Sequence, residues 1–240
     1  MYAVLSDIHG NMYAFHKVLE DMKSFDIDGV IILGDLIDYG MQSNEVVDYL
    51  SHKFYYKIIC NIWGNHERAI MLEDFSGFSS ARGCECAKYT ASILSLATKN
   101  YLNTSMNKDG KQEFEIFGKK CLAVHGSLDD YFWKSIFSDN VHGNYVLYDI
   151  VLSGHSHCSH LFSKFYDIDN PIMRNKHVVT FINPGSVGQP RNHKHTAQYA
   201  LIDNNLNIYF RSITYEVEKA MKLYNGQVDM FYRDRLANGV

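Results

Sequence analysis

A strand–loop–helix unit that recurs in the first third of the chain constrains its fold more than any other feature. Residues 2–6, 29–33 and 57–63 are short apolar runs typical of buried strands, and a helical pattern follows each of the first two. We expect Asn11 and Ser43 to cap these two helices. Successive units of this kind predict a sheet with parallel strands, at whose carboxyl ends ligands gather.

The pattern changes after residue 103, where hairpins replace the helices. Residues 67–103 indicate a helical segment, which we expect to overhang the site like a cap. Beyond it the sequence predicts two separate strands and two hairpins, one of them turning at Asn204 and Asn205, a pair suited to positive φ. These strands are residues 113–117, 120–124, 149–153, 177–182, 196–203 and 206–215. Residues 216–240 form a tail without an assigned role, and residues 1–240 are expected to fold as one α/β domain.

Composition excludes several classes of protein. Of the 240 residues, 46% are hydrophobic and only 3 are Pro, so the chain can bury a substantial core and is not disordered. No uncharged run approaches the roughly 20 residues of a membrane span, and no secretion signal is expected. The 5 Cys form no CxxC pair, which favours a reducing, cytoplasmic location. A net charge of −4 argues against extended nucleic-acid binding.

Five fragments rich in Asp, His and Asn follow the expected strands. They are DIHGN (residues 7–11), GDLIDYG (34–40), GNHE (64–67), HG (125–126) and GHSH (154–157). Each alone is more often a turn or a helix cap, but all five follow a strand and contain glycine. Residues two apart in an extended segment point the same way, so Asp7 and His9 can hold one ion. Carboxylates, imidazoles and amide oxygens without thiolates suit a pair of divalent ions, such as Mn²⁺, Fe²⁺, Co²⁺, Ni²⁺ or Zn²⁺, rather than a structural zinc site.

The order of these fragments resembles a known family. SDIHG, GDLIDYG, GNHE, HG and GHSH resemble the five signature blocks of the calcineurin-like metallophosphoesterase superfamily. NPGSVGQPR (residues 183–191) resembles a segment of its small bacterial and archaeal phosphodiesterase-like members. The resemblance runs from Met1 to about Tyr215. It implies a four-layer α/β/β/α sandwich of two mixed sheets, with a dimetal site at the strand ends.

The resemblance also implies a role for each site residue. One metal is then held by Asp7, His9 and His157, and the other by Asn65, His125 and His155. Asp35 bridges the two metals. His66 is then the group that hydrogen-bonds the phosphate or protonates the leaving oxygen. Two dications can share a hydroxide, lower its pKa and neutralise phosphoryl oxygens during in-line attack. Replacing Asn65 or His125 by Ala is expected to remove the second metal.

Other residues near these fragments have competing interpretations. Asp38 is interpreted as a loop acid that holds backbone N–H groups behind the ligands, rather than as a ligand itself. Arg191 and Arg68 are candidates for binding the substrate phosphate, with a solvated charged surface as the alternative. The aromatic residues at 75–78 and 131–133 could stack on a nucleobase, or they could pack in the core or a lid.

The expected function is metal-dependent hydrolysis of a phosphoester, with a bridging hydroxide as nucleophile. Phosphodiesters of modest size are the first substrate class, and a dinucleoside polyphosphate or a phosphomonoester is the alternative. A protein Ser/Thr phosphatase is disfavoured because Tyr39 stands where that branch carries an Arg, which would clamp phosphate. The non-enzymatic alternative is a binding scaffold, because the same fold resembles a retromer subunit with degraded ligands. The expected partner is a small phosphoester or nucleotide substrate.

Overall fold

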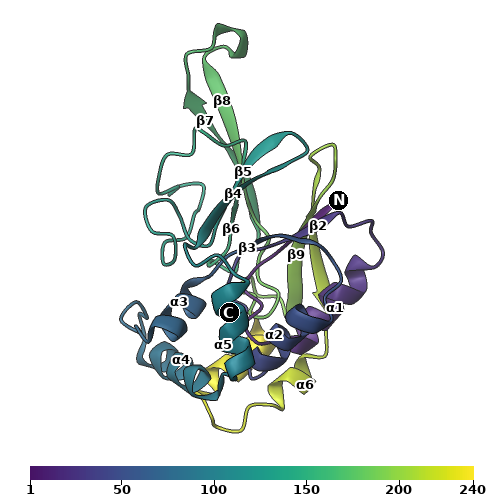
Figure 1. Ribbon diagram of the computed structural model, residues 1–240, viewed down its shortest axis with the longest axis vertical. Helices are drawn as coiled ribbons and strands as arrows, with labels where there is room; N and C mark the ends of the chain where they lie inside the picture. Colours follow the sequence, from purple (N-terminus) through teal and green to yellow (C-terminus); the bar gives the residue numbers. More distant parts are fainter.

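The computed structural model describes residues 1–240, and its strands form two mixed five-stranded sheets (Figure 1). The first sheet contains β1 (Tyr2–Leu5), β2 (Gly29–Ile32), β3 (Ile58–Asn61), β9 (Thr196–Ile202) and β10 (Ile208–Thr214). In its order β10-β9-β1-β2-β3, β1 pairs in parallel with β2 and antiparallel with β9. The second sheet contains β4 (Lys111–Ile116), β5 (Lys119–Val124), β6 (Ile150–Ser153), β7 (His160–Asp167) and β8 (Lys176–Asn183). In its order β4-β5-β6-β8-β7, the three central strands are parallel.

Alternating side chains of the strands build three hydrophobic layers. In β1, Ala3 and Leu5 face the helices, whereas Val4 packs between the two sheets. In β5, Ala123 packs between the sheets and Leu122 faces the opposite side. The central strands of both sheets are therefore buried on two faces, which explains why β1, β2 and β6 have nearly continuous apolar sequences. The expected sandwich of two mixed sheets is confirmed.

Seven helices gather in the lower half of the view in Figure 1 and share one hydrophobic cluster with the free face of the first sheet. They are α1 (Met12–Met22), α2 (Ser43–His52), α3 (Asn65–Leu72), α4 (Ala81–Ile93), α5 (Leu96–Thr104), α6 (Val217–Met221) and α7 (Phe231–Asn238). The free face of the second sheet is covered by residues 126–149, an irregular segment without an α-helix, through Ile136, Val141 and Tyr145. None of the helices has the length and apolar character that crossing a membrane requires.

Several local expectations differ from the structure. Asn11 caps α1 as expected by accepting a hydrogen bond from Ala14 N, but the prediction for Ser43 is wrong. Ser43 is the first residue of α2, and its Oγ accepts a hydrogen bond from Asp38 N (3.0 Å), which fixes the preceding loop instead. Residues 67–103 form a helical segment as predicted, in which short non-helical stretches separate α3, α4 and α5.

The second hairpin turns differently from the prediction, and one strand was missed. The positive φ falls at Leu206 (62°) rather than at Asn204 or Asn205, because the Asp203 carboxylate accepts hydrogen bonds from the backbone of Asn205 and Asn207. Strand β7 was not predicted, because it lies at a sheet edge with many exposed residues and has no continuous apolar run. Strands β7 and β8 form a hairpin that extends beyond the rest of the molecule (Figure 1).

Candidate metal centre

The loops that follow five of the strands meet where the two sheets come together. Hydrogen bonds from Asp7 N to Gly34 O (3.0 Å) and from His9 N to Asp35 O (2.9 Å) join the loops after β1 and β2. A hydrogen bond from His155 N to Asp7 Oδ2 (3.2 Å) joins the loop after β6 to the first sheet. The fold thus brings sequence fragments from both sheets to one place, at the carboxyl ends of parallel strands.

Six Asp and His residues of these loops adopt the left-handed backbone conformation. The angle φ lies between 47° and 71° at Asp7, His9, Asp35, Asp38, His155 and His157. This conformation costs a residue with a side chain on the order of 1 kcal/mol or more, and it persists only where the surroundings fix it. Such strain concentrates at functional sites, and 6 of the 14 non-glycine residues with a positive φ lie at these positions of the sequence fragments.

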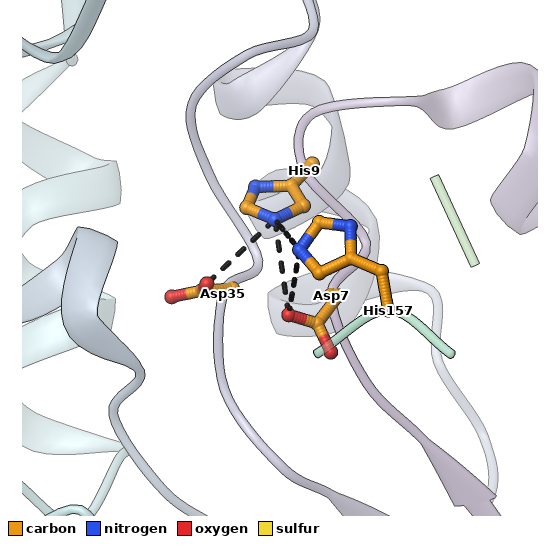
Figure 2. Close-up of side chains that lie close together, drawn as sticks. All are labelled: Asp7, His9, Asp35 and His157. Carbon is orange, nitrogen blue, oxygen red and sulfur yellow. Dashed lines mark hydrogen bonds and ion pairs between the residues drawn. The ribbon is translucent and has the colours of Figure 1, made fainter. Parts of the chain in front are cut away.

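Four of the predicted ligands form a first cluster of buried side chains (Figure 2). His157 Nε2 lies 3.2 Å from Asp7 Oδ1 and 3.1 Å from His9 Nε2, and His9 Nε2 lies 3.6 Å from Asp35 Oδ2. Asp7 Oδ1 and Asp35 Oδ2 are buried without a hydrogen-bond partner, which is costly for carboxylate oxygens. A divalent cation among these donors would satisfy both oxygens, so the residues present fit a metal ion.

A second cluster shares Asp35 with the first. Donor atoms of Asp35, His125 and His155 lie within 4.8 Å of one another, and His125 Nε2 is 3.3 Å from Asp35 Oδ2. Asn65 Oδ1 joins them, 3.0 Å from His125 Nε2 and 2.9 Å from His155 Nδ1. All seven ligands proposed from the sequence therefore lie together, and Asp35 is placed between two donor groups.

Backbone carbonyl groups fix the orientation of the histidine rings. The Nδ1 atoms of His9, His125 and His157 donate hydrogen bonds to the carbonyl oxygens of Ile37 (3.1 Å), Leu33 (2.6 Å) and Gln189 (2.5 Å). A ring that donates from Nδ1 presents the lone pair of Nε2 when it is neutral. His155 is turned the other way, because its Nε2 lies 3.1 Å from Trp133 O and its Nδ1 faces Asn65. Four imidazole nitrogens are thus available as ligands.

Burial and charge set the protonation of these ligands. Burial lowers the pKa of His9 well below its ordinary value, and burial with the neighbouring charge of His125 lowers the pKa of His155 to about 3. Burial also opposes protonation of His125, but the Asp35 carboxylate outweighs it and raises the pKa of His125 to about 9. Burial alone would raise the pKa of Asp35, but the charge of His125 outweighs this effect, so the pKa of Asp35 lies well below its ordinary value. Because metal ligands must be deprotonated, an ion next to Asp35 would replace the His125 proton.

His66 lies beside the ligands but its ring is held by another residue. Its Nδ1 is 2.6 Å from Asp38 Oδ2, and its Nε2 is 3.9 Å from Asp35 Oδ2. Burial lowers the pKa of His66, but Asp35 and Asp38 outweigh this effect and raise it. Asp38 also accepts a hydrogen bond from Thr90 Oγ1 (2.6 Å), so its carboxylate holds side chains and not the backbone N–H groups that were expected. Asp38 therefore orients His66.

Glu67 was not singled out from the sequence, although it organises the loop that carries Asp35. Its buried carboxylate accepts hydrogen bonds from the backbone N–H groups of Asp35 (2.8 Å), Leu36 (2.7 Å), Ile37 (3.3 Å) and Gly64 (2.8 Å). Burial and the nearby charge of Asp35 raise the pKa of Glu67 to about 7. The signal for this role was its place three residues after Gly64, at the third position of α3, where a carboxylate can reach back to the start of a helix.

We expect the Glu67→Gln protein to lose about 2–4 kcal/mol of unfolding free energy, because its amide group would place N–H donors against backbone N–H groups. Urea unfolding of the purified protein measures this loss. The matched control is Glu73→Gln, at the exposed end of the same helix, which should change stability by less than about 0.5 kcal/mol. Equal stability of the two variants would contradict the role of Glu67.

A cavity of about 420 Å³ opens onto the clusters. Its lining includes Asp35, His66 and Arg191, so the structure places one of the two proposed phosphate-binding arginines next to the ligands. Arg68 lies elsewhere, in a neighbouring cavity, with its guanidinium 4.7 Å from the centre of the Phe132 ring. Of the aromatic segments considered above, Phe78 and Trp133 line the cavity that holds the clusters.

The C-terminal helix α7 forms part of the wall of this cavity, which the sequence did not indicate. Tyr232 stacks on Tyr39, with ring centres 4.6 Å apart and planes 18° from parallel. Phe231 and Arg235 line the cavity with Tyr232. No sequence motif marks these residues, and their position depends on tertiary packing alone. Residues 216–240, which had no assigned role, therefore help to enclose the candidate site.

Comparisons with known proteins agree with this architecture. The calcineurin-like phosphoesterase superfamily domain matches residues 1–206. The chain is 27% identical over 245 residues to an uncharacterized protein, MJ0912, of Methanocaldococcus jannaschii, covering 100% of this chain and 98% of that one.

Two solved structures have a similar fold over their whole length. A metallophosphoesterase of Sphaerobacter thermophilus has a TM-score of 0.75 and 22% identity, with 100% of this chain and 98% of that chain covered. The hypothetical protein PH1004 of Pyrococcus horikoshii OT3 has a TM-score of 0.75 and 20% identity, with 100% and 99% covered. The family match extends over most of the chain and includes all five sequence fragments. The chain belongs to the calcineurin-like phosphoesterase superfamily.

Proposed function

We propose that this protein is a metal-dependent phosphoester hydrolase, with phosphodiesters of modest size as its first substrate class. The observation that carries the proposal is the position of Asp35 between two buried donor groups, on the floor of a cavity that His66 also lines. When bound, two divalent ions would supply Lewis acidity and activate water for attack on phosphorus.

The proposal assigns a task to each group of residues. Asp7, His9 and His157 would hold one ion, Asn65, His125 and His155 the other, and Asp35 would contact both. His66, oriented by Asp38, would donate a hydrogen bond to a phosphoryl oxygen or a proton to the leaving oxygen.

An assay with three substrates tests this function. Purified protein is treated with EDTA, reloaded with Mn²⁺, and given bis-p-nitrophenyl phosphate, p-nitrophenyl phosphate and a dinucleoside tetraphosphate. We expect metal-dependent turnover, with the diester cleaved faster than the monoester. Turnover of only the monoester or only the dinucleoside compound would select the alternative substrates. Absence of turnover with Mn²⁺, Fe²⁺, Co²⁺, Ni²⁺ and Zn²⁺ would contradict the proposal and favour a binding scaffold.

A further inference from the structure

The cavity beside the clusters has a wall of arginines that the metal site does not use. Arg82 from α4, Arg191 from the segment after β8 and Arg235 from α7 all line it. The only acidic residue in the lining is Asp35, whose carboxylate belongs to the clusters. The lining of the cavity therefore carries three arginines and one carboxylate, and that carboxylate belongs to the clusters.

These three arginines lack the carboxylate partners that two other arginines of the chain possess. Arg211 pairs with Asp21 (2.7 Å) and Arg233 with Asp234 (2.6 Å), whereas none of the three in the cavity lies within 4.0 Å of a carboxylate. The Nε atoms of Arg191 and Arg235 are buried and have no hydrogen-bond partner. Buried guanidinium N–H groups without acceptors are costly, and an anionic ligand would supply the acceptors.

Packing holds two of the guanidinium groups in place without neutralising them. The Arg82 guanidinium lies 4.2 Å from the centre of the Phe231 ring, and the Arg235 guanidinium lies 4.7 Å from it. Burial and the charge of Arg191 lower the pKa of Arg235 to about 10, so it remains protonated at neutral pH. The arginines are therefore preorganised next to each other in spite of their mutual repulsion, as in sites that bind phosphate groups.

We propose that Arg82, Arg191 and Arg235 form a subsite for a second phosphate group of the substrate, beyond the one that is cleaved. One cavity of about 420 Å³ contains both the clusters and the arginines, so a single small ligand can contact both. The substrate class is then a phosphoester or phosphoanhydride that carries at least one further phosphate, such as a nucleoside or dinucleoside polyphosphate. That the bound polyphosphate is a substrate depends on the hydrolase function proposed above, whereas the binding of an anion here depends on the arginines alone.

The binding test uses the full chain after EDTA dialysis, so that neither hydrolysis nor metal chelation interferes. Inorganic tripolyphosphate and orthophosphate are titrated calorimetrically into the wild-type protein and into Arg82→Gln and Arg235→Gln. We expect wild-type protein to bind tripolyphosphate at least about tenfold more tightly than orthophosphate, and each variant to lose about ten- to hundredfold in tripolyphosphate affinity.

Arg233→Gln is the matched control, because Arg233 lies on the same helix but pairs with Asp234 and does not line the cavity. It removes the same charge and should bind tripolyphosphate like the wild type. Arg235→Lys keeps the charge and should retain more affinity than Arg235→Gln, which separates anion binding from a packing defect. Equal wild-type affinities for tripolyphosphate and orthophosphate, or equal losses in Arg233→Gln and Arg235→Gln, would overturn the subsite.

A kinetic arm separates the subsite from the hydrolase function. With Mn²⁺-loaded protein, the ratio of kcat/KM for a dinucleoside tetraphosphate to kcat/KM for bis-p-nitrophenyl phosphate should fall about tenfold or more in Arg235→Gln. If hydrolysis occurs but this ratio stays constant, the subsite is wrong and the hydrolase function stands. If no phosphoester is hydrolysed but tripolyphosphate affinity still depends on Arg82 and Arg235, the subsite stands and the hydrolase function is wrong.

Discussion

The Asp35→Asn protein is expected to bind neither divalent ion tightly and to lose about a thousandfold or more of its phosphoester hydrolysis. Asp35 is the one residue shared by both donor clusters, so its replacement weakens both proposed ion sites together. An amide nitrogen would replace a carboxylate oxygen that is buried without a hydrogen-bond partner. A loss of about 4 kcal/mol of transition-state stabilisation by the ions corresponds to a rate that is about a thousandfold lower. Metal analysis after gel filtration and kcat/KM with bis-p-nitrophenyl phosphate measure the two effects.

The comparison with His125→Ala makes this test specific. His125 belongs only to the second cluster, so its loss should leave the first ion bound while Asp35→Asn loses both. Circular dichroism should show that both variants are folded. Asn has the shape of Asp, and His125→Ala removes the side-chain hydrogen bond to Leu33 O but keeps the backbone hydrogen bonds of residue 125 to Gly110 and Gly154. Two ions per chain in either variant would refute the ligand assignment.

The His66→Gln protein should keep both ions and lose about 10²- to 10⁴-fold in kcat, the usual contribution of a positioned acid or base. Asp38 holds Nδ1 of His66 and leaves Nε2 on the cavity side, where it can reach a bound phosphoester. The loss should depend on the leaving group. An alkoxide needs a proton as it departs, so the loss should be large for an alkyl phosphodiester and smaller for a p-nitrophenyl diester.

Three observations check this role of His66. Asp38→Asn, which can still accept a hydrogen bond from the ring, should reduce kcat less than His66→Gln does. Equal losses for alkyl and p-nitrophenyl substrates would show that His66 does not protonate the leaving group and would leave it a phosphate-binding role. Loss of an ion from His66→Gln would place it among the ligands instead.

The residues of the two donor clusters could be singled out from the sequence because their signals are local. Each of the five fragments follows an apolar strand and contains a glycine, and the strand order places these ends together. Gly64 illustrates why glycine is needed, because a Cβ atom there would lie 2.1 Å from Asp35 Oδ1. Ser43 was misassigned because a serine that starts a helix can bond outward as well as cap it, and only the path of the preceding loop decides.

The rest of the site has no local signal. Arg235 and Phe231 lie on a short helix without a regular apolar pattern, and their position follows from the stacking of Tyr232 on Tyr39. Glu67 was visible in the sequence, but its four backbone partners come from two loops that meet only in the folded chain. Sequence periodicity indicates which face of a helix or strand is buried. The contacts of α7 and Glu67 depend instead on which helices, strands and loops pack together in the folded chain.

The position of α7 has a consequence for when the candidate site forms during synthesis. The candidate site joins Asp7, just after the end of the first strand, to Arg235, almost the whole length of this sequence later. At about 5–20 residues per second, a ribosome needs on the order of ten seconds or more to make the residues between them. Strand β1 also has one unpaired edge until β9 has been synthesised, because its two neighbours in the sheet are β2 and β9. A nascent chain therefore displays the candidate metal ligands long before it has the last of the arginines that line the cavity beside them.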